Sequence, residues 1–94
     1  MLSTKEARLA VRMSSCKDFD GELEALQEAA IADMKAAGIA EKEDDQLYNN
    51  ALRMYLRGHF EVGAPDAEAC RQIYEDLKIT MKNTDYYRAG EADA

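Results

Sequence analysis

The chain has 94 residues, and its 12 lysines and arginines stand against 19 aspartates and glutamates, giving a formal net charge of −7. This length suits one small domain, and no stretch approaches the ~18 consecutive apolar residues of a membrane-spanning helix, so no membrane contact is expected. The acidic balance also disfavours a surface that grips the phosphates of nucleic acid.

The first helix is expected to begin after Ser3, because Ser3 and Glu6 have the spacing of a capping box. We expect it to end near Ser14 and Ser15, whose hydroxyls compete for backbone partners. Four residues are predicted to face inward: Leu2, Leu9, Ala10 and Met13.

A second and longer helix is expected to follow, with Asp18 as its N-cap. Its apolar stripe comprises Phe19, Leu23, Leu26, Ala30 and Met34. Gly38 can adopt the left-handed conformation that ends a helix, and Ile39 then lies where a Schellman motif brings it against Met34.

The third helix follows a charged loop, residues 40–45, whose acids suit a helix N-terminus. It is predicted to be the central helix, weakened at its end by Gly58 and Gly63. Its wide apolar face comprises Leu47, Tyr48, Ala51, Leu52, Tyr55, Leu56, His59 and Phe60.

After Pro65, Asp66 is a suitable N-cap for a fourth helix. Its apolar positions are Ala67, Cys70, Ile73, Tyr74, Leu77 and Met81, and the pattern fails after Thr80. The prediction is an all-α fold: a small bundle of about four helices over residues 1–82, and a flexible C-terminal docking segment over residues 83–94.

No catalytic, cofactor-binding or metal-binding residues are predicted. The single histidine, His59, lies on an apolar helix face, where a packed and hydrogen-bonded histidine is the usual finding. Cys16 and Cys70 are too few for a disulfide framework and suit small buried positions. The acids at 18–20 lack the remaining ligands of a calcium loop, and those at 41–45 are typical of a solvated face.

The sequence points instead to contacts between proteins. With no tryptophan and two phenylalanines the core is thin, so we expect further burial in a homo-oligomer. The adjacent Tyr86, Tyr87 and Arg88 have no helical register, and tyrosine and arginine commonly anchor interfaces. They are the predicted interface residues, although packing against their own bundle is an equal alternative.

The order of these motifs resembles the head-tail connector, or head-completion adaptor, proteins of long-tailed bacteriophages and prophages. The likeness begins with Thr4-Lys5-Glu6-Ala7, Val11-Arg12-Met13-Ser14, and Leu23, Leu26, Ala29 and Ala30 before Gly38. It continues through Asp45, Leu47, Ala51, Leu52, Tyr55, His59 and Phe60, and ends with Ile73, Tyr74, Leu77, Tyr86 and Tyr87.

The resemblance implies a non-catalytic structural subunit that associates with DNA packaging. Its copies would form a ring beneath the portal, extend the DNA channel and join head to tail, with the portal and a tail-completion protein as partners. Double-stranded DNA would pass without specific binding, since an acidic channel repels phosphates. The protein would be found in the virion, and in the host cytoplasm during assembly. The resemblance also implies that Tyr86 and Tyr87 contact the portal protein.

Two other functions remain open. The dense acids of residues 18–50 suit a small acidic helical module that regulates or inhibits a basic partner. An enzyme centred on His59 is the third hypothesis.

Overall fold

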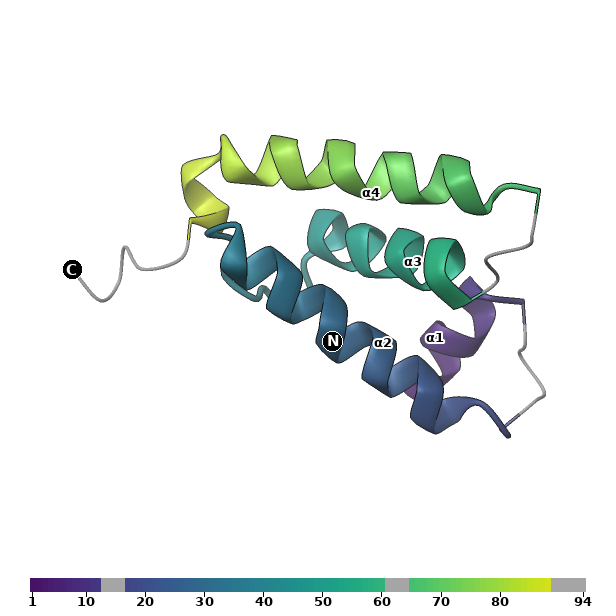
Figure 1. Ribbon diagram of the computed structural model, residues 1–94. Coiled ribbons are helices and arrows are strands. Elements are labelled where there is room, and N and C mark those ends of the chain that lie inside the picture. The colour runs from purple at the N-terminus through teal and green to yellow at the C-terminus, as the bar shows by residue number, and fades with distance from the viewer. Residues whose placement is uncertain (13–16, 61–64, 89–94) are drawn as a thin grey trace.

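A computed structural model describes residues 1–12, 17–60 and 65–88. The described elements are α1 (Thr4–Ala10), α2 (Asp20–Ala36), α3 (Gln46–Phe60), α4 (Ala67–Lys82) and a short 3-10 helix, η1 (Asp85–Tyr87). Helix α3 contacts α1, α2 and α4, and α4 lies above it in Figure 1 while α1 lies below. The predicted all-α bundle with a central third helix is confirmed. The flexible segment was predicted over residues 83–94; the structure describes residues 83–88 of it, and residues 89–94 lie outside the described ranges.

Helix α1 begins as predicted and ends earlier than predicted. The Ser3 hydroxyl accepts a hydrogen bond from the Glu6 amide, and the Glu6 carboxylate accepts one from the Ser3 amide. The helix stops at Ala10, before Met13, Ser14 and Ser15, which lie outside the described residues.

The predicted inward face of α1 is partly wrong. Leu9 is 55% exposed, whereas Ala7 and Val11 are buried. Positions two apart on a helix lie ~200° apart around its axis, so a helix that buries Ala7 turns Leu9 outward.

The start of α2 is also corrected. Phe19 takes the N-cap position without a side-chain cap, and Asp18 is exposed. The next carboxylate, on Asp20, accepts two hydrogen bonds from the Arg8 guanidinium, at 2.8 and 2.6 Å. The cap expected of Asp18 is therefore not formed, and Asp20 links α2 to Arg8 of α1.

Helix α2 ends in the predicted Schellman motif. Gly38 has φ of 89°, its N–H donates to the Lys35 carbonyl, and the Ile39 N–H donates to the Met34 carbonyl at 2.9 Å. Ile39 is completely buried, so this turn also supplies a core side chain.

Helix α3 is capped by Asp45, whose Oδ2 accepts the Tyr48 N–H at 3.0 Å. Gly58 lies inside the helix, and α4 packs on it: a Cβ at this position would come within 2.5 Å of Arg71 Cγ. The helix continues through Gly58 to Phe60, and Gly63 lies outside the described residues.

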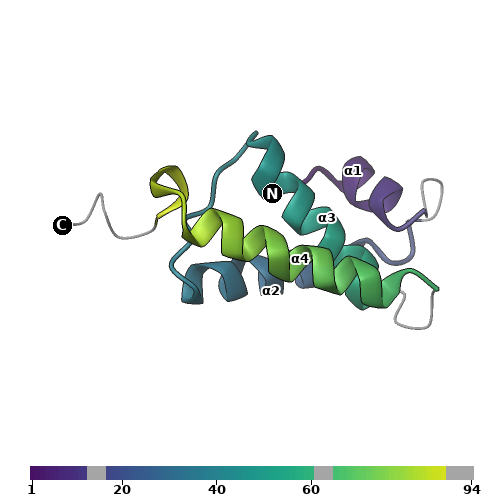
Figure 2. The same ribbon diagram turned by 90° about the horizontal axis from the view of Figure 1, so that it is seen from above.

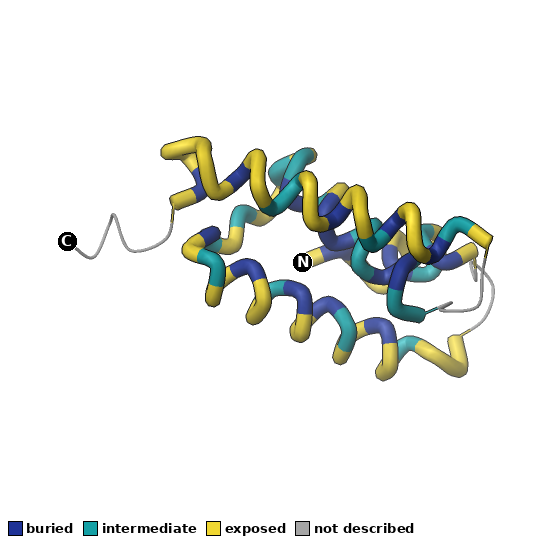
Figure 3. Tube along the Cα trace, turned by 45° about the horizontal axis from the view of Figure 1, so that its top comes forward, coloured by how far each residue is buried: buried dark blue, intermediate teal, exposed yellow. Residues whose placement is uncertain are grey.

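The N-cap position of α4 is Asp66, as predicted, but its side chain caps nothing. Its carboxylate pairs instead with Arg57 of α3 and, at 3.6 Å, with Arg12. Ile73, expected in the core, is largely exposed, while Cys70, Tyr74 and Met81 are buried. Figure 3 shows how buried and exposed residues alternate along the helices.

The boundary expected at residue 82 falls inside the packed unit. Helix α4 does end at Lys82, but η1 turns back and places Tyr87 in the same hydrophobic cluster as Met34, Ile39 and Met81. Figure 2 shows η1 beside the end of α4 and the α2–α3 connection. None of the helices in the described ranges is long and apolar enough to cross a membrane.

Candidate protein-interaction surface

The C-terminal segment 85–88 is anchored by Tyr87, which is only 7% exposed. Its hydroxyl donates to Asp45 Oδ2 at 2.8 Å, and its carbonyl accepts the Ala40 N–H at 2.7 Å. An antiparallel bridge between Ile39 and Arg88 continues this contact. The segment therefore holds the loop between α2 and α3.

Asp45 is shared by two donors at this junction. The same carboxylate oxygen that caps α3 through Tyr48 also accepts the Tyr87 hydroxyl. Burial, followed by this hydrogen bond to a carboxylate, raises the pKa of Tyr87 to about 12, so the hydroxyl stays protonated as a donor.

Tyr86 lies on the outside of the same turn and is 60% exposed. Its ring meets that of Tyr87 edge-on, with 5.0 Å between centroids, and Lys42 Nζ lies 4.6 Å from the Tyr86 centroid. Arg88 pairs with Asp85 at 3.1 Å. Tyr86 therefore packs on a buried neighbour and has one cation, Lys42, close to its ring. Tyrosine is one of the residue types enriched among interface anchors.

The structure thus separates the three predicted interface residues. Tyr87 packs against its own bundle, whereas Tyr86 and Arg88 remain accessible. We call Lys42, Asp85, Tyr86 and Arg88 the C-terminal patch.

His59 is packed as predicted. Its ring stacks on Tyr55, with 3.9 Å between centroids, and its Nδ1 lies 2.9 Å from the Tyr55 carbonyl oxygen. Cys70 is buried, and Cys16 lies outside the described residues. Across residues 1–12, 17–60 and 65–88, His, Cys, Asp and Glu form no group of three or more that could hold a metal ion.

A polar cluster that sequence reasoning missed joins α2 to α4. Asp33 Oδ2 accepts the Tyr74 hydroxyl at 2.7 Å and Lys78 Nζ at 2.8 Å. The hydrogen bonds from Lys78 and then Tyr74 lower the pKa of the Asp33 carboxyl. Burial, followed by the bond to Asp33, raises the pKa of Tyr74. Only the spacing of Tyr74 and Lys78, one helical turn apart, hinted at this shared partner.

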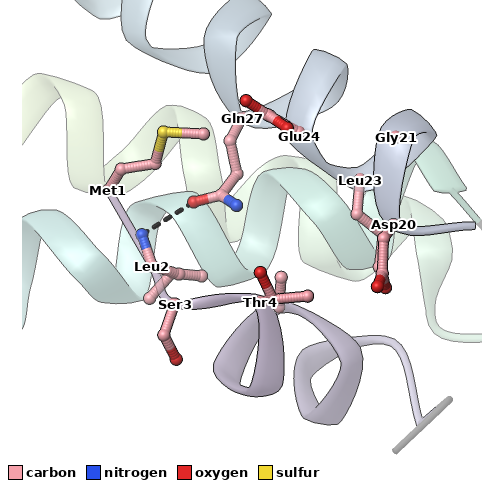
Figure 4. A pocket seen from close by; sticks show the side chains of 10 residues that line it. Met1, Leu2, Ser3, Thr4, Asp20, Gly21, Leu23, Glu24 and Gln27 are labelled. Carbon is pink, nitrogen blue, oxygen red and sulfur yellow. Dashed lines mark hydrogen bonds between the residues drawn. The ribbon is translucent and has the colours of Figure 1, made fainter. Parts of the chain in front are cut away.

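A pocket of about 310 Å³ separates the N-terminal segment from α2 (Figure 4). Gln27 is 3% exposed and its Oε1 accepts the Leu2 N–H at 2.8 Å, which ties the segment to the helix. The titratable side chains of the lining are Asp20 and Glu24. The α2 pattern predicted apolar inward residues, so this buried amide was missed.

Several large apolar side chains remain exposed outside the core. Besides Tyr86 they include Leu9 on α1 and Ile73 and Ile79 on α4. Beside Leu9 is a hollow of about 370 Å³, lined also by Glu6, Ala10 and Arg53. These side chains extend the candidate interaction surface beyond the C-terminal patch.

Comparison of the chain with protein-family models, with curated proteins and with solved structures finds no match.

Proposed function

We propose that this protein is a head-tail connector subunit of a bacteriophage or prophage. In this role its copies form a ring beneath the portal, extend the DNA channel and present a docking surface for the tail. The role is structural and non-catalytic, in the virion and, during assembly, in the host cytoplasm. The observation that carries the proposal is the exposure of large apolar side chains on separate faces of one small bundle: Leu9, Ile79 and Tyr86.

Exposed apolar residues matter in a bundle of this size. A domain of fewer than a hundred residues buries only about three fifths of its extended-chain surface, so contacts with further copies add burial that one subunit lacks. The order of motifs that resembles the connector proteins supports the same role.

The charge on α2 suits a channel that DNA traverses. Glu22, Glu24 and Glu28 are all exposed on this helix. Carboxylates at a channel wall repel the phosphates and leave the duplex free to slide. We therefore propose that DNA passes without specific binding.

The C-terminal patch is the proposed contact with the portal. The resemblance implies that both Tyr86 and Tyr87 contact this partner. Because Tyr87 is buried against Asp45 and Ala40, the Tyr86 side chain with Arg88 makes the contact in our proposal.

The test is capture of the chain on purified rings of a portal protein encoded in the same genome, followed by electron microscopy. We expect the wild-type chain to form a collar on the ring and Tyr86→Ala to bind at least about tenfold more weakly. Phe19→Ala is the matched control, since Phe19 is an exposed aromatic on another element. A wild-type chain that does not bind the portal overturns the proposal.

The acidic surface of α2 favours a second candidate, a regulatory or inhibitory module that occupies a basic partner. Binding carried by exposed charges weakens steeply with salt, because the Debye length falls from about 10 Å at 0.1 M to about 3 Å at 1 M. A host protein captured at low salt, released at high salt and lost with Glu24→Lys would favour this candidate over the connector.

A further inference from the structure

The pocket of about 310 Å³ between the N-terminal segment and α2 is large enough for a small organic molecule (Figure 4). Binding sites for small molecules begin at about 300 Å³ and combine apolar walls with a few polar groups. Three residues of the lining are apolar and buried: Leu2, Ala7 and Leu23. They provide a surface for a short hydrocarbon group.

A buried amide, that of Gln27, also faces the pocket. Its Oε1 accepts the Leu2 N–H at 2.8 Å, and this bond turns Nε2 the other way, into the space that Figure 4 shows. Among the described residues Nε2 has no hydrogen-bond acceptor, although Gln27 is only 3% exposed. Buried N–H groups are nearly always hydrogen-bonded, and one without a partner costs free energy. An acceptor oxygen in the pocket would remove this cost.

The charges of the lining favour a cation. Its two acidic residues are Asp20 and Glu24. The Asp20 carboxylate is paired with Arg8 at 2.6 Å. The Met1 ammonium group, also in the lining, lies 3.6 Å from Glu41. Glu24 forms no ion pair with any residue in the described parts of the chain. One unpaired negative charge therefore remains in the lining, one helical turn before the buried amide.

We propose that this pocket binds a small organic cation that carries an ammonium group and a neutral carbonyl oxygen on a short apolar body. The carbonyl oxygen accepts a hydrogen bond from Gln27 Nε2, and the ammonium group pairs with Glu24. The apolar body packs on Leu2 and Leu23. An amino-acid amide has this chemistry, and so has the first residue of a peptide. The inference does not depend on the proposed connector function.

The same lining disfavours a free amino acid. Its carboxylate would lie near Asp20 and Glu24, and the cation of the lining, the Met1 ammonium group, already contacts Glu41. A neutral carbonyl oxygen needs only a donor, which Nε2 supplies. The pocket should therefore distinguish an amino-acid amide from the corresponding acid.

The test is titration of the full isotope-labelled chain with leucinamide, followed by NMR, which observes the side-chain amide of Gln27 directly. We expect the Gln27 signal to shift with a Kd on the order of 1 mM, as suits so small a ligand. Three related probes each lack one feature. Leucine has a carboxylate in place of the amide, isocaproamide lacks the ammonium group, and isoamylamine lacks the carbonyl group. Each should bind about threefold more weakly or worse.

Glu24→Gln tests the ion pair. Glu24 is exposed, so the helices should be retained, which circular dichroism checks. We expect this variant to bind leucinamide about threefold to fivefold more weakly and to bind isocaproamide, which has no charge, as the wild type does. Glu28→Gln is the matched control, because Glu28 lies one turn further along α2 and outside the lining, and it should change neither affinity.

Water is the alternative occupant, because a water molecule can also accept a hydrogen bond from Nε2. An unchanged Gln27 signal at about 10 mM leucinamide, ten times the expected Kd, would show that the pocket holds water only and would overturn the inference. Equal affinity for leucine and leucinamide, or equal effects of Glu24→Gln and Glu28→Gln, would overturn it as well.

A tripeptide amide that begins with leucine separates the two sources of this chemistry. If it binds as tightly as leucinamide, the pocket takes the first residue of a peptide. If leucinamide binds and the tripeptide amide does not, the pocket takes a free small molecule. Both results support the site.

Discussion

At the scale of the residue, the side chain of Asp33 links α2, to which it belongs, to α4. One of its carboxylate oxygens accepts both the Tyr74 hydroxyl and the Lys78 ammonium group from α4. The donors lower the pKa of this carboxyl from its ordinary 3.8, with Lys78 the larger cause. A lowered carboxyl pKa means that the folded state holds its proton less tightly than the unfolded state, so the contact depends on pH.

We expect Asp33→Asn to lower the free energy of unfolding at pH 7. The stability from the ionised carboxyl is fully present above the unfolded pKa near 3.8, and is lost as pH falls through the lower folded pKa. The difference between Asp33→Asn and the wild type should therefore shrink toward pH ~2. Urea unfolding at several pH values measures it, with Glu28→Gln as the control. A difference independent of pH would contradict this account of Asp33.

At the scale of the element, the close packing of α3 against α4 depends on Gly58. A Cβ there would lie 2.5 Å from Arg71 Cγ, 3.1 Å from the backbone nitrogen of Arg71 and 3.3 Å from the backbone carbonyl oxygen of Ala67. Arg71 Nη1 also donates to the Gly58 carbonyl at 2.7 Å. Glycine is poor for the helix alone but permits the approach of its neighbour.

Gly58→Ala should lower the free energy of unfolding by about 1–2 kcal/mol. Overpacking costs about 1–3 kcal/mol and outweighs the gain of up to about 1 kcal/mol in helix propensity. Gly21→Ala in α2 is the matched control, because nothing lies within 4 Å of a Cβ there. We expect it to be neutral or to stabilise by up to about 1 kcal/mol. Equal changes in melting temperature for both variants would show that α4 moves aside for the added Cβ at position 58 without loss of stability.

At the scale of the whole molecule, the C-terminal segment closes the bundle at the end where α2 and α4 finish. Tyr87 joins the core cluster and holds the α2–α3 loop through Asp45 and Ala40. This arrangement contradicts the expectation from sequence that the bundle ends at residue 82.

A chain ending at residue 84 should therefore unfold more easily than one ending at residue 88. Removing a buried aromatic costs about 3–5 kcal/mol, a large part of the stability of so small a domain. Tyr87→Ala in the full chain should produce a similar loss, whereas Tyr86→Ala, at 60% exposure, should change stability by less than ~0.5 kcal/mol. If the two truncated chains have the same melting temperature, segment 85–88 does not belong to the cooperative core.

The features that the sequence by itself determined are local ones. The Ser3–Glu6 capping box, the Schellman turn at Gly38 and the four helices depend on residues within one or two turns of each other, and on a helical period of apolar side chains. The packed histidine followed from the same pattern.

Only the tertiary structure decided which members of a pattern are buried and where the acids act. It turned Leu9 outward and buried Gln27, placed Phe19 instead of Asp18 at the N-cap of α2, and paired Asp20 with Arg8. It also divided the adjacent tyrosines, burying Tyr87 and exposing Tyr86. The physical reason is that these choices depend on partners far along the chain, such as Asp45 for Tyr87, which become neighbours only when the helices pack.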